Sequence, residues 1–290
     1  MHQLNKNIFF FIKLLIFLGS IIYLFYFIDF NNFLKILDIE YIFGNYLYLI
    51  IFFLLSLLNN IFNLERFKII CKYFLNTKIK KNDSTQIIFY SSLASEAGSA
   101  FLVLARYFLS KKINLSLKNN FFVILVEKFL SLLFFIIYFC IFLTTINIFF
   151  IFLLFALMIF LYLVKNTRFY KEKMEDFKDK YFAFVYSFLI QIIAFIQLYL
   201  CVRIMNFELS NYQIFFVIPG LILLSSISPT FTDWGYREFV FVIVLDFFSF
   251  MKEEAFLLSL IFGLFTLISS FLLVILYEIN IYLSKLKIFK

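Results

Sequence analysis

The sequence has very little of the chemistry on which most soluble enzymes depend. It contains one histidine in 290 residues, and that histidine is His2. Because a Ser–His–Asp triad and a histidine-rich metal site both need histidine inside the fold, both are excluded. The three cysteines, Cys71, Cys140 and Cys201, show no paired spacing, which predicts unpaired thiols. We therefore expect no metal and no cofactor.

Charge is also scarce. Only 15% of the residues are charged and 64% are hydrophobic, with a mean hydropathy of +0.99. This balance excludes a soluble domain and indicates a polytopic membrane protein. The net charge of +8 comes from bases in short loops between apolar runs. Bases in such loops set membrane orientation, so we expect no nucleic-acid partner.

The long apolar runs predict an all-α membrane protein, a polytopic helical bundle with about six crossings and two oppositely oriented broken or re-entrant hairpins. A crossing helix needs about 20 apolar residues. The predicted crossings are Ile8–Ile28, Tyr41–Phe62, Phe121–Thr144, Ile148–Val164, Tyr181–Ile204 and Ala255–Leu276. Basic loops follow the positive-inside rule and place both termini in the cytoplasm. We expect one membrane domain over residues 1–290, without a soluble domain, in the inner membrane of a bacterial cell.

Two further segments do not fit a simple crossing. Gln86–Leu109 has basic loops on both sides and a polar centre, which predicts a hairpin that enters from the cytoplasm and breaks near Gly98. Tyr212–Phe250 consists of two short apolar runs around a polar break, which predicts a hairpin that opens to the outside. Broken segments entering from opposite faces are expected where a site lies near the membrane midplane.

The break in the second hairpin is the most unusual stretch of the chain. Within ten positions it holds Pro229, Asp233, Gly235, Arg237 and Glu238. Proline breaks a helix, and a charge at the bilayer centre costs about 2.5–3.5 kcal/mol on insertion scales. Such a segment must be buried in protein or line a wet cavity. We therefore expect this break to form part of the working site.

Two interpretations remain open for the arginines. Arg237 and Glu238 could form a mutual or interhelical salt bridge, or Arg237 could bind a lipid phosphate while Glu238 tunes it or relays a proton. Arg106 could anchor the cytoplasmic interface or make a second phosphate contact. Glu96 could pair with Arg106 or Arg237, or be protonated through desolvation. Each of these residues is an ionisable group within a membrane segment and is a functional candidate.

The remaining candidates lie on neighbouring segments. Glu127 and Lys128 are adjacent and point to different sides of their helix, so Glu127 is expected to face Arg106 or Arg237. Asp233 is positioned to cap the second half-helix. Glu65, Arg66 and Lys68 lie at the end of a crossing and are expected to set orientation and contact lipid headgroups. The candidate substrate-binding residues are Arg237, Glu238, Arg106, Glu96, Glu127, Lys128, Asp233 and Gly235.

Four motifs occur in a fixed order along the chain. They are Leu64-Glu65-Arg66-Phe67-Lys68, Glu96-Ala97-Gly98 running on to Arg106, Glu127-Lys128, and Ile227-Ser228-Pro229 followed by Trp234-Gly235-Tyr236-Arg237-Glu238. In this order they resemble the membrane region of the lysylphosphatidylglycerol synthase family, which is often described as flippase-like. The resemblance covers nearly the whole chain.

The resemblance implies a protein that handles lipids. The soluble aminoacyl-transfer domain of full-length synthases is missing from this sequence, so the expected role is to translocate a lipid and not to synthesise lysylphosphatidylglycerol. The leading hypothesis is a flippase or transporter for an anionic lipid or lipid-linked glycoconjugate. The alternative is a non-catalytic membrane partner of a glycosyltransferase or envelope-lipid assembly enzyme. A membrane-embedded transferase is less favoured, because the chain has neither a histidine inside the fold nor a clustered metal site.

Overall fold

The computed structural model describes residues 44–75, 77, 79–113, 115–146, 177–207, 209–226 and 234–288, with a few positions between residues 19 and 29. All regular structure within these ranges is helical, which confirms the all-α class. Four of the helices are long and apolar enough to cross a membrane. The predicted crossings Ile8–Ile28 and Ile148–Val164 lie largely or wholly outside the described residues, so the count of six stays a prediction.

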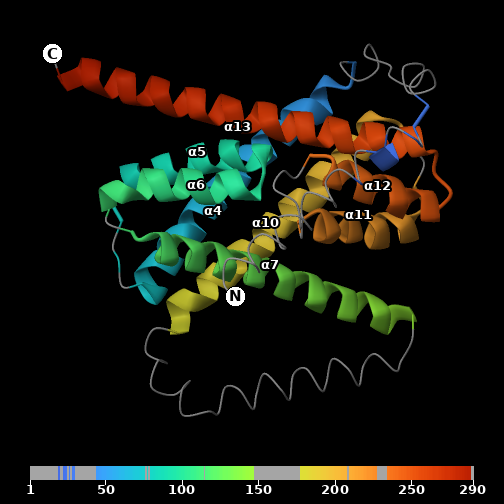
Figure 1. Ribbon diagram of the computed structural model, residues 1–290, viewed down its shortest axis with the longest axis horizontal. Helices are drawn as coiled ribbons and strands as arrows, with labels where there is room; N and C mark the ends of the chain where they lie inside the picture. The colour runs from blue at the N-terminus through green and yellow to red at the C-terminus, as the bar shows by residue number, and fades with distance from the viewer. Residues whose placement is uncertain are drawn as a thin grey trace.

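The four long helices form the frame of the molecule. Helices α4 and α10 pack along one another through its centre, and α13 runs across its whole length (Figure 1). Their bounds are α4, Tyr46–Phe74; α7, Leu117–Ile146; α10, Phe177–Ile204; and α13, Lys252–Ile288. These helices agree with four of the predicted crossings and place the two shorter helix pairs between them.

All four helices extend beyond the predicted bounds, and α4 and α13 do so by the most. The apolar run predicted to end at Phe62 continues as α4 through Arg66 to Phe74. The charged residues in this extension are good helix formers, and the buried side chain of Arg66 ties the extension to the interior. Helix α13 begins before the predicted crossing Ala255–Leu276, so Glu253 and Glu254 form its first turn, where acidic side chains suit the helix dipole.

The first predicted hairpin is confirmed as a broken helix pair. Helix α5, Lys81–Ala97, and helix α6, Ser99–Ser110, are separated only by Gly98. Gly98 has a φ of 139°, a conformation that side-chain-bearing residues rarely adopt. The two helices lie side by side (Figure 1), and a short 3₁₀ turn, Lys111–Ile113, follows them.

The second predicted pair is also present. Helix α11, Asn211–Ser226, precedes the break, and helix α12, Tyr236–Phe247, follows it. Gly235 begins α12 with a φ of 85°, which again favours glycine. Pro229 and Asp233 lie outside the described residues, so the prediction that Asp233 caps the half-helix stays a prediction.

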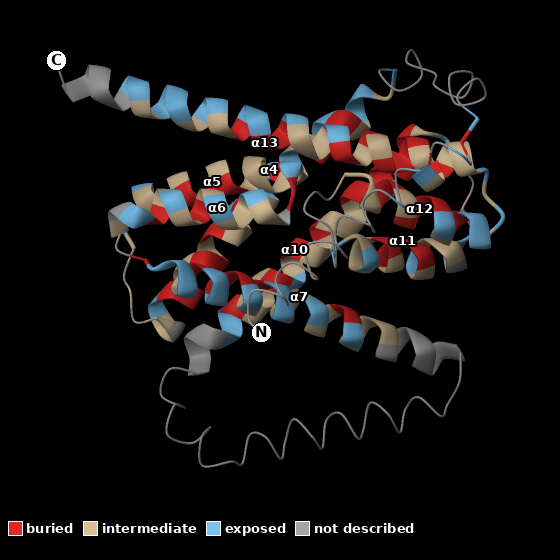
Figure 2. Ribbon diagram, in the orientation of Figure 1, coloured by how far each residue is buried: buried red, intermediate tan, exposed pale blue. Residues whose placement is uncertain are grey.

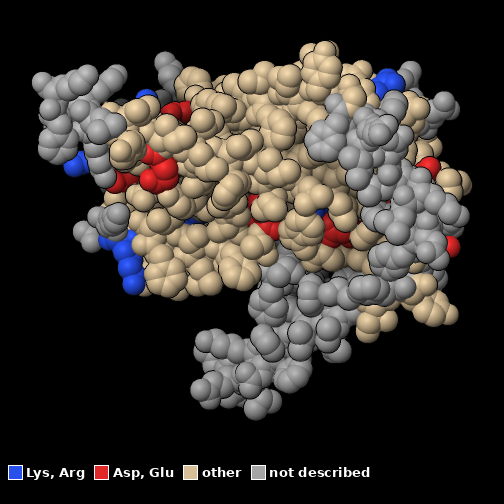
Figure 3. All heavy atoms as spheres, turned by 90° about the horizontal axis from the view of Figure 1, so that it is seen from above, with Lys and Arg blue, Asp and Glu red and all other residues tan. Residues whose placement is uncertain are grey.

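The buried apolar side chains form two clusters. One joins α10, α11, α12 and α13 and includes Phe241, Val242 and Leu257. The other joins α4, α5 and α7 and includes Phe67 and Ile87. Figure 2 shows buried residues gathered where these helices face one another and exposed residues along α13 toward its C-terminal end. On the face drawn in Figure 3 most described atoms belong to uncharged residues, as expected of a surface that meets lipid.

Candidate functional site

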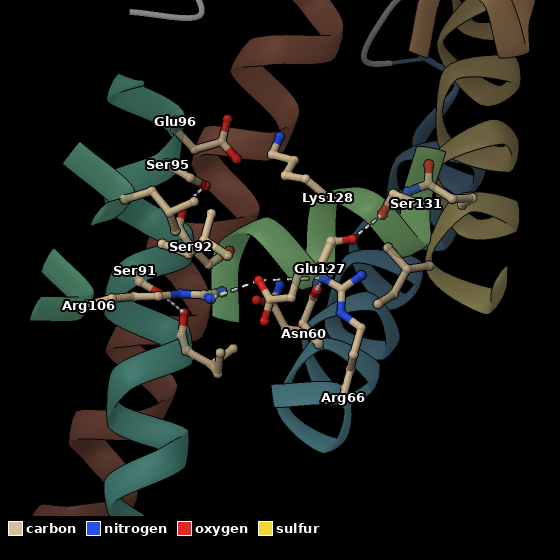
Figure 4. Close-up of a pocket in the computed structure, with 16 residues that line it drawn as sticks. Asn60, Arg66, Ser91, Ser92, Ser95, Glu96, Arg106, Glu127, Lys128 and Ser131 are labelled. Atoms are coloured by element: carbon tan, nitrogen blue, oxygen red, sulfur yellow. Dashed lines mark hydrogen bonds and ion pairs between the residues drawn. The ribbon is translucent and has the colours of Figure 1, made fainter. Parts of the chain in front are cut away.

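A polar cavity of about 300 Å³ lies between α4, α5, α6, α7 and α10. Its wall carries charged and hydroxyl side chains (Figure 4), although α4, α7 and α10 are long and largely apolar. The polar lining residues are Asn60, Asn63, Arg66, Ser91, Ser92, Ser95, Glu96, Arg106, Glu127, Lys128, Ser131 and Gln191. Buried polar groups in a membrane protein mark functional sites, so this cavity is the candidate site.

Glu127 on α7 lies at the centre of the cavity, between two arginines (Figure 4). Its Oε2 is 2.8 Å from Nη1 of Arg106 and 3.9 Å from Nη2 of Arg66. All three side chains are at most 7% exposed. The predicted contact between Glu127 and Arg106 is therefore confirmed. Because Glu127 supplies one negative charge to two guanidinium groups, the cluster retains an excess positive charge.

The guanidinium groups are held by neutral partners on neighbouring helices. Arg106 donates from Nε to the Ser91 hydroxyl at 3.3 Å, and its guanidinium lies 5.4 Å from the centre of the Phe67 ring. Arg66 donates to Asn63 Oδ1 at 2.7 Å and to the Ser187 hydroxyl at 3.2 Å. These contacts fix the direction of both cations without neutralising them, which preorganises them for an anion.

The position of Arg66 corrects an expectation from the sequence. Arg66 was expected at a crossing end, in contact with lipid headgroups, but it is only 6% exposed and lines the cavity. Glu65 and Lys68 do form a partly exposed pair, with 2.7 Å between Oε1 and Nζ. The spacing of Asn60, Asn63 and Arg66 places all three on one helix face, and that polar face was the signal available in the sequence.

Two more charged residues border the cavity. The Lys128 ammonium donates to the carbonyl of Ser226 at 3.2 Å. The Glu96 carboxylate accepts from the Thr266 hydroxyl at 3.0 Å. The cavity wall thus carries three cations and two carboxylates, an arrangement that suits an anionic ligand. Within the described part of the chain, no three His, Cys, Asp or Glu side chains come together to hold a metal ion.

Arg237 and Glu238 form a separate cluster and do not line the cavity. Their side chains pair at 2.9 Å, and both contact the Ser259 hydroxyl at 3.3 Å. The salt-bridge interpretation of this pair is therefore the one that the geometry matches. Glu238 Oε2 also accepts from the backbone N–H of Gly235 at 2.5 Å and so caps α12.

The break of the second hairpin, which was expected to form part of the working site, lies between Ser226 and Trp234, outside the described residues. Among the described residues that line the cavity, none lies on α11 or α12. The hairpin contacts cavity residues through the Ser226 carbonyl, which accepts from Lys128. It also contacts them through Trp234, which donates from Nε1 to the carbonyl of Glu96 at 2.7 Å and stacks under the Arg237 guanidinium at 5.0 Å. Trp234, which follows the second break, therefore lies against Glu96, which precedes the first break and lines the cavity.

An apolar groove of about 410 Å³ adjoins the cavity, between α7, α10 and α11. Its lining is aromatic and aliphatic apart from Gln191, which also lines the polar cavity. Phe134, Phe188 and Phe215 are among the aromatic residues that line it. The polar cavity and the apolar groove thus share one lining residue, Gln191.

Long apolar helices around a buried, positively charged cavity define a multi-pass α-helical membrane protein with a polar internal cavity. Comparison with protein families matches residues 10–273 to the lysylphosphatidylglycerol synthase TM region. The chain therefore belongs to that family, which confirms the resemblance drawn from its motifs. Neither the curated proteins nor the solved structures gave a match to this chain.

Proposed function

We propose that this protein binds an anionic lipid or lipid-linked glycoconjugate in the polar cavity and moves its headgroup across the inner membrane. The observation that carries the proposal is the pair of buried arginines around Glu127, with Lys128 at the same cavity. Ionisable groups within membrane segments are costly and mark the paths of substrates. Family membership supports a lipid-related role for the chain.

The geometry suits a phosphate. Arginine presents a fixed fork of donors that matches phosphate oxygens, and lysine adds a mobile point charge. The Arg66–Glu127 separation of 3.9 Å is loose compared with the Arg106–Glu127 contact of 2.8 Å. A phosphate would supply the second negative charge that Glu127 alone does not provide to the two guanidinium groups.

The apolar groove suits the hydrocarbon chain of the same ligand. Gln191 borders both the groove and the polar cavity, so one amphiphile would place its headgroup on the arginines and its chain between α7, α10 and α11. Phe188 in the groove is 42% exposed, which leaves the groove open at the lipid-facing surface. The proposed role involves binding and movement and no catalytic step.

The test is lipid movement by the purified protein in vesicles. Fluorescent phosphatidylglycerol in the outer leaflet is destroyed by dithionite, and movement is measured as the labelled fraction that becomes reactive. We expect movement with the wild type, loss with Arg106→Gln and Arg66→Gln, and wild-type movement with Lys68→Gln, whose side chain lies outside the cavity.

Each variant must elute as a single folded species before its transport is compared. Wild-type rates in both arginine variants would overturn the proposal. An inactive wild type that copurifies with a stoichiometric glycosyltransferase would instead support the partner role expected as the alternative.

A further inference from the structure

The carboxyl group of Glu96 lies beside a hydroxyl that has two acceptors within hydrogen-bonding distance. Thr266 Oγ1 on α13 is 3.0 Å from Glu96 Oε2 and 2.9 Å from the backbone carbonyl oxygen of Gly263. A hydroxyl carries one hydrogen and donates to only one of these acceptors at a time. Both contacts are hydrogen bonds at once only when Glu96 carries a proton and donates it to Thr266 Oγ1. The Thr266 hydroxyl therefore suits the ionised and the protonated form of Glu96 equally.

The other carboxyl group of the cavity has partners of a different kind. Glu127 Oε2 contacts the guanidinium groups of Arg66 and Arg106. A proton on Glu127 would remove the counter-charge of two buried cations, which is costly. A proton on Glu96 leaves its contact with Thr266 satisfied. Of the two carboxyl groups, Glu96 is thus the one whose surroundings accommodate a change of charge.

The charged groups around Glu96 come from four helices. They are Arg66 on α4, Arg106 on α6, Glu127 and Lys128 on α7, and Arg237 and Glu238 on α12, the last pair being connected to Glu96 through Trp234. Helix α13 also packs against α5, but residues 255–276 of α13 include no titratable side chain. Helix α10 contributes no titratable residue to the described wall of the cavity.

The charge of Glu96 changes the charge balance of the cavity. With Glu96 and Glu127 both ionised, the wall has one more cation than carboxylates, and a proton on Glu96 raises this excess to two. An anion then binds more tightly, because opposite charges attract more strongly in a site shielded from water. By linkage, a bound anion favours the protonated form of Glu96 to the same extent.

We propose that Glu96 is a proton-binding site and that the proton binds together with the anionic ligand of the cavity. The proton comes from water in the cavity and forms one O–H bond on Glu96, while the Thr266 hydrogen turns to the Gly263 carbonyl. This inference rests on the proposed function and adds proton coupling to it, whatever the headgroup. A proton gradient would then favour movement of the lipid in one direction.

The first experiment measures binding of dihexanoyl phosphatidylglycerol to the purified wild type by titration calorimetry. Its phosphodiester keeps one negative charge throughout the range used, so the lipid itself does not titrate. We expect the affinity to rise about tenfold from about pH 8 to about pH 5, as one coupled proton implies. Titrations in buffers of different ionisation enthalpy should show that the protein takes up protons as the lipid binds.

The second experiment follows Glu96 without any ligand. Trp234 is the single tryptophan of the chain, and its Nε1 donates to the Glu96 carbonyl at 2.7 Å, so its fluorescence reports on this residue. We expect a one-proton transition in the wild type and none in Glu96→Gln, whose amide also donates to Thr266 but does not titrate. Glu96→Asp retains a carboxyl group and should retain a transition.

Two control variants separate Glu96 from other titrating groups. Glu65→Gln removes a carboxyl group that is 39% exposed and lies outside the cavity. His2→Gln removes the single histidine of the chain. Both variants should keep the wild-type dependence of lipid affinity on pH, whereas Glu96→Gln should bind the lipid equally well across the range.

A wild-type affinity that does not change with pH, without proton uptake, would overturn the inference and leave the proposed function standing. A Glu96→Gln variant with the wild-type pH dependence would also overturn it, because the proton would then bind elsewhere. Failure of the lipid to bind at any pH would instead overturn the proposed function itself. Proton uptake by the wild type is measured without any variant, so a variant that misfolds does not prevent the test.

Discussion

The indole Nε1 of Trp234 donates a hydrogen bond to the backbone carbonyl of Glu96 at 2.7 Å. The two residues are 138 positions apart, and each lies beside the break of a different hairpin. The same indole ring lies under the guanidinium of Arg237 at 5.0 Å. A single side chain therefore connects the two hairpins at the edge of the polar cavity and gives a means of testing whether they act together.

Replacing Trp234 with Phe should loosen this connection. Phe keeps a ring under Arg237 but has no N–H to donate to Glu96. We expect amide exchange around Gly98 and Gly235 to rise roughly fivefold, as the loss of one hydrogen bond implies. Hydrogen exchange measured by mass spectrometry checks this.

Trp234→Leu separates the two contributions of the indole, because it removes the ring as well as the donor. It should raise exchange further, especially near Arg237. Unchanged exchange in Trp234→Phe would show that the hydrogen bond does not hold the two breaks together.

Gly263 on α13 accommodates the guanidinium of Arg237. A β-carbon at position 263 would lie 1.8 Å from Arg237 Nη2. Gly263→Ala must therefore displace Arg237 from its buried pair with Glu238, and we expect a loss of about 1–3 kcal/mol in stability. The measurement is the midpoint of thermal unfolding in detergent.

Gly220→Ala is the control for this substitution. Gly220 lies inside α11 and has no atom within 4 Å of an added β-carbon. Alanine is favoured over glycine in a helix by about 1 kcal/mol, so this variant should be neutral or stabilised. Equal unfolding midpoints for the two variants would contradict a steric role for Gly263.

Neutralising Glu127 should be far more costly than neutralising Glu65. Glu127→Gln leaves Arg66 and Arg106 buried without a counter-charge, and breaking a buried ion pair in this way costs about 3–5 kcal/mol. Glu65 is 39% exposed in its pair with Lys68, so Glu65→Gln should cost less than about 1 kcal/mol. Thermal unfolding of both variants in the same detergent tests the difference.

An anionic ligand should partly rescue Glu127→Gln, because phosphate supplies the charge that the variant lacks. We expect added phosphatidylglycerol to raise its unfolding midpoint more than that of the wild type. A Glu127→Gln variant as stable as Glu65→Gln would show that the cluster is solvated and not a closed ion-pair site.

Filling the apolar groove should weaken the binding of long-chain lipids. Ile222 on α11 lines the groove, and Ile222→Trp would occupy space that we assign to a hydrocarbon chain. Excluding even two methylene groups from burial lowers affinity by about tenfold. Binding of dioleoyl and dihexanoyl phosphatidylglycerol is compared, and only the longer lipid should lose affinity.

Leu224→Trp provides the control for the added indole. Leu224 lies on the same helix, is 42% exposed and does not line the groove. It should bind both lipids as the wild type does. If Ile222→Trp lowered the affinity for both lipids equally, the hydrocarbon chain would bind outside the groove.

Local physics made much of the fold predictable. Helix α10 begins and ends close to the predicted crossing, because the bilayer selects apolar runs of a set length. The break near Gly98 was also predictable, from the polar centre of its segment and the basic loops on both sides, and Gly98 adopts the positive φ that glycine allows. The end of α4 was not predictable, because its last turns are rich in polar residues and are nonetheless helical in the folded protein.

The site was less predictable than the fold. The adjacency of Glu127 and Lys128 indicated that they point to different sides of their helix and that Glu127 faces Arg106 or Arg237, and its contact with Arg106 is one of these two alternatives. Arg66 was misplaced, because a basic residue near the end of an apolar run usually marks the membrane surface. For Arg237 the sequence left two interpretations open, because a charge within a membrane segment does not reveal its partner; the structure shows the pair with Glu238.

The sequence by itself determined that this is a helical membrane protein with two broken helix pairs, because apolar length and glycine conformation are local properties. Tertiary structure decided which charges meet. Arg66 reaches Ser187, 121 positions away, only because α4 packs against α10. Arg66, Arg106 and Glu127 come from three different helices, and their convergence depends on how those helices pack, which no local pattern encodes.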